Sequence, residues 1–441
     1  MAGQFPFPHA VYGGGPVLSA PNVITVTFPG NAFASDLASF GSSIATSSYW
    51  TSVTSDLTCG GASACIGPGP AGSSAVSTVV LGSSYADSVG PGGPGNTLQP
   101  FLQSVIKALP ASQQPQANDL YVFYIPASTT ITLDGAPSCT SFGGYHNTMM
   151  VGGTQVVYAI VLDCGTREQL SEEQAITFAA SHEIIEASSD AVLSASGPET
   201  GYSLDETLQN SYPWLTLQLS ELGDLCVDFL SLGEDITTEN GFSVQRIWSP
   251  ANAATGTMDP CVPSNGEVYF NAFPTVSAVI VDVGQSTTFE VDALALGTEP
   301  AWTLAVEDAT VLGQPDQYLS FSIEGGNNVN GVGAIGATSG DTFQVTVQML
   351  QDPATAPSSL GWGLGITASY NGLDPQAATR GHIWPFMVLT SAEAAQFGIT
   401  MAESLPHHVV EQLARRARRR AHPTVPRSRF LDPLLPLLRA R

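Results

Sequence analysis

Residues 171–187 (SEEQAITFAASHEIIEA) constrain the fold of this chain more than any other segment. Ser171 is a favourable helix N-cap, and Gln174, three residues later, completes a capping box. Glu172 and Glu173 occupy the first turn, where the helix dipole favours acidic side chains. The remaining positions are mostly apolar, so we expect a largely buried helix. Buried acids need partners, so its later acidic residues must meet compensating groups.

The same helix carries the motif His182-Glu183-Ile184-Ile185-Glu186. His182 and Glu186 are four residues apart and therefore share one face. In H-E-x-x-H enzymes the residues at i and i+4 bind zinc, and the Glu at i+1 polarises the metal-bound water. A carboxylate is an acceptable zinc ligand, although it also favours harder ions such as manganese or calcium. We therefore predict a metal site with His182 and Glu186 as ligands and Glu183 as general base.

Catalytic zinc sites usually have three protein ligands and one open position, so a third ligand is needed. Glu221 and Asp224 are three residues apart and could both face His182 from one helical turn. Asp190, two turns beyond His182, is a further candidate. His146 could bind the metal or contact a substrate, although a structural hydrogen bond is the simpler interpretation of a lone histidine. The rival interpretation is an exposed helix without metal.

Charge is unevenly distributed along the 441 residues. Residues 1–400 contain four basic side chains, whereas residues 401–441 contain nine arginines. The acidic body argues against nucleic acid as a partner, because phosphate contacts require Lys and Arg. We expect residues 396–441 to form a basic tail, partly helical over 403–421 or disordered, which could also fold back on the acidic body.

Six cysteines fall into local pairs, which predicts three disulfides although six cysteines allow fifteen pairings. The pairs are Cys59 with Cys65, Cys139 with Cys164, and Cys226 with Cys261. An even count and scarce lysine favour an oxidising compartment, and a four-cysteine zinc site is disfavoured because no C-x2-C pair occurs.

No stretch of about 18 apolar residues predicts a transmembrane helix. The N-terminal sequence MAGQFPFPHAVYGGGPV lacks the charged and apolar regions of an ordinary signal peptide. An extracellular location therefore requires a signal absent from this sequence or another export route.

Strand and helix patterns alternate through the first 264 residues. Strands are expected over 22–29, 120–125 and 155–162, and helices over 33–50, 98–109 and 171–187. This alternation predicts an α+β domain with helices packed on a sheet. Residues 265–395 instead contain short strand-like runs separated by turn residues, which is typical of a β-sandwich. These runs cover 267–270, 277–283, 287–294, 302–306, 319–323, 342–350 and 364–370.

Several short blocks resemble the EXORDIUM-like, or phosphate-induced, secreted proteins of plants and bacteria. The resemblance covers roughly residues 10–262. Its blocks are Tyr12-Gly13-Gly14-Gly15-Pro16-Val17-Leu18, Gly144-Tyr145-His146, Tyr158-Ala159 with Asp163-Cys164, Ser181-His182-Glu183-Ile184-Ile185-Glu186-Ala187, and Glu221-Leu222-Gly223-Asp224-Leu225-Cys226. It implies an extracellular protein with a zincin-like helix, in a family associated in plants with growth and cell-wall signalling. The chain departs from the family in its C-terminal half, its Arg-rich tail and its Ser189-Asp190-Ala191, where the family tends toward Thr-Asp-Pro.

These features together predict a secreted metal-dependent hydrolase, preferentially a zinc peptidase acting on peptides or an extracellular polymer. The main alternative is a non-enzymatic extracellular or cell-surface binding protein with a structural or vestigial metal site. A third possibility is a metal-independent glycan hydrolase that uses the same acids. The sequence leaves the substrate, the metal and the oligomeric state open.

Overall fold

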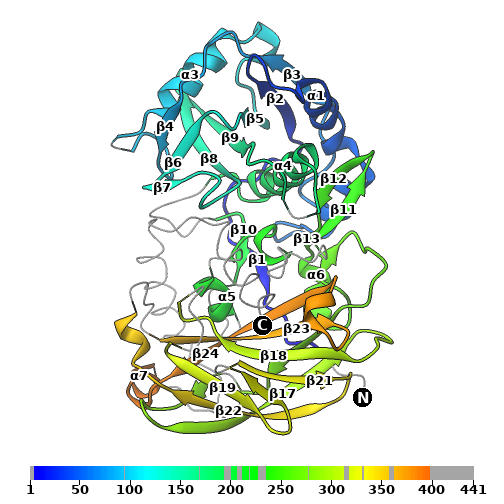
Figure 1. Cartoon of the computed structure of the whole chain (residues 1–441). Coiled ribbons are helices and arrows are strands. Elements are labelled where there is room, and N and C mark those ends of the chain that lie inside the picture. Colours follow the sequence, from blue (N-terminus) through cyan, green and yellow to red (C-terminus); the bar gives the residue numbers. More distant parts are fainter. Residues whose placement is uncertain are drawn as a thin grey trace.

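In the computed structural model, helices and many strands are combined, as the sequence predicts. The structure describes residues 4–93, 95–167, 169–192, 200–205, 211–217, 219–226, 235–276, 278–311, 317–329, 332–356 and 362–397. The basic tail expected over 396–441 therefore lies outside the described residues, except for residues 396–397 at the end of α7 (Ser391–Phe397). Figure 1 shows the helix-rich N-terminal half at one end and two strand-rich layers at the other.

A five-stranded sheet organises the N-terminal half. Its order is β3 (Ser73–Val76), β2 (Asn22–Thr27), β5 (Asp119–Ile125), β9 (Thr154–Leu162) and β8 (Gly144–Val151). The first four strands are parallel, and β8 runs antiparallel to β9 along the edge. Parallel strands need helical crossovers, which explains the alternating sequence pattern.

Successive residues of the central strands face opposite layers. On one face, Val122 and Ala159 share a core with α1 (Ala34–Ser43) and α4 (Glu172–Ser189). On the other face, Phe123 and Ile160 pack with α3 (Leu98–Ala108). The sheet therefore lies between two helical layers, and α4 packs on the face that it shares with α1.

The predicted central helix is confirmed with its cap. Ser171 accepts a hydrogen bond from the backbone N–H of Gln174, whose side chain accepts one from the Ser171 N–H. The single helix expected over 33–50 is wrong, because α1 ends at Ser43 and α2 (Ser48–Thr54) begins after a short 3-10 turn. Ser47 N-caps α2 by accepting from the Trp50 N–H, and such side-chain bonds compete with a continuous helix.

Three small pairs of strands lie beside α4 or between it and the C-terminal half (Figure 1). They are β1 (Ala10–Tyr12) with β10 (Tyr202–Leu204), β11 (Ile236–Glu239) with β12 (Phe242–Gln245), and β13 (Ile247–Trp248) with β14 (Cys261–Val262). A three-stranded sheet of β4 (Ser84–Asp87), β6 (Thr130–Leu133) and β7 (Ala136–Pro137) lies beside β8. The short helices are α5 (Tyr212–Thr216) and α6 (Pro250–Thr255).

Two sheets face one another in the C-terminal half. One contains β15 (Phe270–Pro274), β17 (Ser286–Ala295), β22 (Thr342–Met349) and β19 (Leu319–Ile323). The other contains β16 (Val279–Ile280), β24 (Gly381–Leu389), β23 (Gly363–Asn371), β18 (Trp302–Asp308), β21 (Val332–Ala337) and β20 (Asn327–Val329). Side chains from both sheets form one apolar core. The run expected over 267–270 lies mostly before β15, and β24 was not predicted.

Aromatic side chains link the two halves. Phe5 and Phe7 lie buried in the N-terminal segment and pack against Tyr269 and Trp384 of the C-terminal half. Phe7 also contacts Trp248 of β13. These rings belong to the same core as α4, so that core extends across residue 264, while a second core lies within the C-terminal half. The domain division itself stays a prediction.

The three predicted disulfides are confirmed, as Cys59–Cys65, Cys139–Cys164 and Cys226–Cys261. They fit a protein of an oxidising compartment. Among the described residues, no helix is long and apolar enough to cross a membrane.

Candidate metal centre

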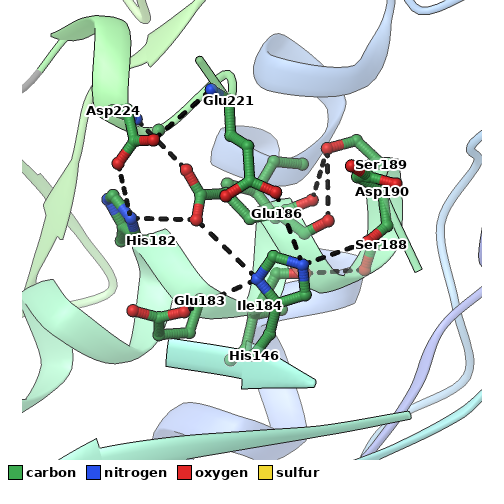
Figure 2. Close-up of polar contacts among 12 residues, drawn as sticks. His146, His182, Glu183, Ile184, Glu186, Ser188, Ser189, Asp190, Glu221 and Asp224 are labelled. Atoms are coloured by element: carbon green, nitrogen blue, oxygen red, sulfur yellow. Dashed lines mark hydrogen bonds and ion pairs between the residues drawn. The ribbon is translucent and has the colours of Figure 1, made fainter. Parts of the chain in front are cut away.

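Helix α4 presents three ionisable side chains toward one buried cluster. His182, Glu183 and Glu186 come from this helix, and His146 comes from the edge strand β8. Glu221 and Asp224 come from the segment that contains the 3-10 turn η4 (Asp224–Cys226). Figure 2 shows His182 and His146 directed at the carboxylate of Glu186, with Glu183 and Glu221 beside His146.

His182 faces two carboxylates through one ring nitrogen. Its Nε2 lies 3.0 Å from Oε2 of Glu186 and 3.7 Å from Oδ1 of Asp224. Asp224 is oriented by its second oxygen, Oδ2, which accepts from the backbone N–H groups of Ser220 and Glu221 at 3.4 Å. The structure thus brings Asp224, one of the two acids predicted as third ligand, to the predicted pair His182 and Glu186.

Gln245, at the end of β12, determines which nitrogen of His182 carries hydrogen. Its amide group donates from Nε2 to the backbone oxygen of Gly223 at 2.6 Å. Its Oε1 therefore faces Nδ1 of His182 at 2.9 Å and can only accept, so Nδ1 is the donor. Nε2 of a neutral His182 then has its lone pair directed at the carboxylates. Histidine metal ligands are commonly oriented by such a hydrogen bond to the other nitrogen.

His146 lies on the other side of Glu186. Its Nδ1 is 3.8 Å from Oε2 of both Glu183 and Glu186, and its Nε2 is 3.6 Å from Oε1 of Glu221. Nε2 also lies 3.0 Å from the backbone oxygen of Asp190. The structure therefore places His146 inside the cluster.

Asp190 meets the cluster through its main chain. Its backbone oxygen contacts His146, whereas its carboxylate Oδ1 accepts from the Gly201 N–H at 2.7 Å. Asp190 is the C-cap of α4 and has a non-helical backbone conformation. Its described contacts make it a support for His146 and for the β10 segment.

Two glycines allow the elements to approach. A Cβ on Gly223 would lie 2.7 Å from Oε1 of Glu186 and 2.7 Å from Nδ1 of His182. A Cβ on Gly144 would lie 2.7 Å from Oε1 of Glu183 and 3.0 Å from the Ile160 backbone oxygen. Both positions require glycine because any side chain would occupy the space of the cluster.

The cluster is almost completely buried. His146, Glu183, Glu186, Glu221 and Asp224 are each exposed by 5% or less. The side chain of His182 is 15% exposed, which makes it the most accessible member of the cluster.

The electrostatics of these side chains reflect an excess of carboxylates. Burial lowers the pKa of His146, but Glu221, Glu183 and Glu186 outweigh it and raise that pKa to about 9. Burial opposes protonation of His182 too, yet Glu186 and its acidic neighbours raise its pKa well above the usual value. Burial raises the pKa of Glu186 to about 8, assisted by Asp224 and Glu221. Without a cation, protons must therefore compensate the acids.

The donor set fits a divalent metal. The side chains form two groups, His182 with Glu183 and Glu186, and His146 with Glu186 and Glu221. Within each group, one ligand-capable atom of every residue lies within 4.8 Å of those of the other two. Two imidazoles and several carboxylates suit zinc and also manganese. Sequence reasoning missed Gln245, because nothing in the pattern of a short strand distinguishes a buried amide that orients a ligand.

Comparison with known proteins gives no family for this chain. No family model matches it, and no curated protein matches it. Among solved structures, it is similar to a conjugative transposon lipoprotein from Bacteroides eggerthii (11% identity, TM-score 0.19), covering 27% of this chain and 95% of that one. Domain 1 of VCBP3 from Branchiostoma floridae is 8% identical with a TM-score of 0.19, over 29% and 98% of the two chains.

A third structure, AvmM, which catalyses macrocyclization in alchivemycin A biosynthesis, is 10% identical with a TM-score of 0.16. It covers 29% of this chain and 91% of AvmM. Likenesses this slight support no inference about function, so the functional argument depends on the site.

Proposed function

We propose that this protein is a secreted metal-dependent hydrolase, with a peptide as preferred substrate, in which His182, Glu186 and Asp224 bind a divalent cation. The observation that carries the proposal is the orientation of His182. Gln245 accepts from its Nδ1, while its Nε2 faces Glu186 at 3.0 Å and Asp224 at 3.7 Å. Donors bound to one tetrahedral zinc at about 2.0–2.1 Å lie about 3.3 Å apart, which is close to both separations.

When bound, the cation would supply Lewis acidity and lower the pKa of a coordinated water. Glu183 follows His182 on α4, and its carboxylate belongs to the same group of ligand-capable atoms. It is the candidate general base, accepting the proton of the attacking water. Gln245 accepts from His182 and donates to the backbone oxygen of Gly223, so it links His182 to the segment that carries Asp224. We also propose that the chain is related to the EXORDIUM-like secreted proteins and that its N-terminal half has a zincin-like fold.

Metal analysis tests the binding step. Chelator-treated protein is reconstituted with zinc, freed of excess ion, and analysed by elemental mass spectrometry. We expect at least one zinc per chain in the wild type and a loss of at least one equivalent in His182→Ala. His9, which is exposed and distant in sequence, provides the matched control His9→Ala with wild-type content. A wild type without stoichiometric metal would refute the proposal.

Burial favours a second candidate, a non-enzymatic extracellular protein whose metal is structural. A polymer substrate needs access, yet His146, Glu183 and Glu186 are each exposed by 5% or less. Digestion of a peptide library by zinc-loaded protein separates the two. Cleavage that is abolished both by chelator and by Glu183→Gln supports the hydrolase. Stoichiometric zinc without cleavage supports the structural site.

A further inference from the structure

Glu186 lies between two histidines that point at it from different elements (Figure 2). His182 approaches along α4, and His146 approaches from β8. Oε2 of Glu186 is 3.0 Å from Nε2 of His182 and 3.8 Å from Nδ1 of His146. A single zinc bound at His182 makes no use of His146 or Glu221, although both are as buried as the residues that bind it.

The tautomer of His146 can be read from its main-chain contact. The backbone oxygen of Asp190, 3.0 Å from Nε2, can only accept a hydrogen bond, so Nε2 carries hydrogen. In a neutral imidazole the lone pair then resides on Nδ1, which faces Glu183 and Glu186. The arrangement repeats that of His182, whose Nδ1 is held by Gln245. Each imidazole thus has one nitrogen fixed by a neighbour and the other directed at carboxylates.

The distances around His146 suit a shared cation better than direct hydrogen bonds. N–H···O bonds have separations of about 2.7–3.2 Å, and the oxygens of Glu183 and Glu186 that face Nδ1 of His146 both lie 3.8 Å away. Two donors of one zinc lie about 3.3 Å apart, so a small contraction around an ion would bring these atoms to bonding positions. Both carboxylates and the imidazole are 2–5% exposed, so water does not readily compensate their charge.

The charge of the buried acids also favours two cations over one. Glu183, Glu186, Glu221 and Asp224 contribute four negative charges when ionised, and two neutral imidazoles contribute none. One divalent cation leaves two of these charges to be compensated by protons, whereas two divalent cations compensate all four.

We propose that the centre holds two divalent cations that share Glu186 as a bridging carboxylate. His182 and Asp224 complete the first site. His146 and Glu221 complete the second, because one ligand-capable atom of each lies within 4.8 Å of the other and of Glu186. The inference rests on the proposed function, because the first site is the one proposed there. Hydrolytic two-metal centres place their ions about 3.5–4 Å apart, a separation that one carboxylate can bridge.

Cobalt(II) titration of chelator-stripped, full-length protein tests this proposal. We expect two cobalt ions per chain at saturation. Two adjacent cobalt ions couple magnetically, so the electron paramagnetic resonance signal should grow with the first equivalent and shrink with the second. This measurement needs no variant. His146→Gln, which keeps an amide that can donate to Asp190, should bind one cobalt, and so should His182→Ala. His9→Ala should bind two.

Each outcome has a distinct meaning. One uncoupled cobalt per wild-type chain would overturn the two-metal centre and leave the proposed function standing. No stoichiometric cobalt, with none of zinc either, would overturn both. Two cobalt ions that persist in folded His146→Gln would place the second ion elsewhere and refute the shared centre. Two coupled ions, reduced to one by either histidine variant, would support it.

Discussion

Replacing Gln245 with Leu removes the group that orients His182 but leaves every proposed metal ligand in the sequence. The Gln245 side chain is fully buried and makes two described bonds, accepting from His182 and donating to Gly223. Leu has a similar volume but can do neither. Nδ1 of His182 and the Gly223 oxygen then lose their partner, and His182 can rotate or change tautomer.

The expected loss follows from the position of Gln245 behind a ligand. Removing a hydrogen bond that orients a metal-bound histidine typically costs 10–100-fold in metal affinity, or about 1.4–2.8 kcal/mol. The metal-free protein should also lose roughly 1–3 kcal/mol of stability, because two buried polar groups become unsatisfied.

Gln113→Leu is the matched control. Gln113 is also a buried glutamine, and its Nε2 donates to the Ser73 hydroxyl and the Ser74 backbone oxygen at 3.1 Å, away from the cluster. Zinc affinity is measured by competition with a chromophoric chelator, and folding by circular dichroism. Gln113→Leu should lower stability and leave affinity unchanged. If folded Gln245→Leu binds zinc as tightly as wild type, the proposed role of this hydrogen bond is incorrect.

Three further predictions concern other parts of the structure. Gly144→Ala should lower the free energy of unfolding by roughly 1–3 kcal/mol through overpacking, which lowers the thermal midpoint, and should reduce hydrolysis. The neighbouring Gly143 has open space at its Cβ, so Gly143→Ala should change neither the midpoint nor hydrolysis. Burial and two nearby guanidinium groups lower the pKa of His382 to about 3, so only the unfolded chain gains its proton as pH falls from 6.5. Between pH 6.5 and 3, the free energy of unfolding of the wild type should therefore fall by up to about 1.4 kcal/mol per pH unit relative to that of His382→Gln. A difference in thermal midpoint between the two proteins that does not change with pH would contradict this. Replacing Cys226 and Cys261 with Ser opens a 35-residue loop and should lower the free energy of unfolding by about 4 kcal/mol. It should also weaken zinc binding. Unchanged zinc affinity would show that the η4 segment keeps its position without the disulfide.

Local patterns were sufficient for much of the secondary structure. The capping box of Ser171 and Gln174 fixed the start of α4, and the runs that became β5, β9 and β19 were found because period and composition are local properties. The helix expected over 33–50 failed because Ser47 caps a new helix. Strand β8 was missed because GYHNTMMV mixes polar and apolar residues without a regular alternation.

By itself, the sequence determined that His182 and Glu186 share a helix face and that Glu183 adjoins them, since an α-helix fixes positions four residues apart. Tertiary structure decided everything that depends on separate segments meeting. It set Asp224 beside His182 and Glu221 beside His146, placed Gln245 behind a ligand, and directed the Asp190 carboxylate to Gly201. The physical reason is that side-chain direction along one helix follows from local geometry, whereas the convergence of helix, edge strand and turn follows from packing around the shared core.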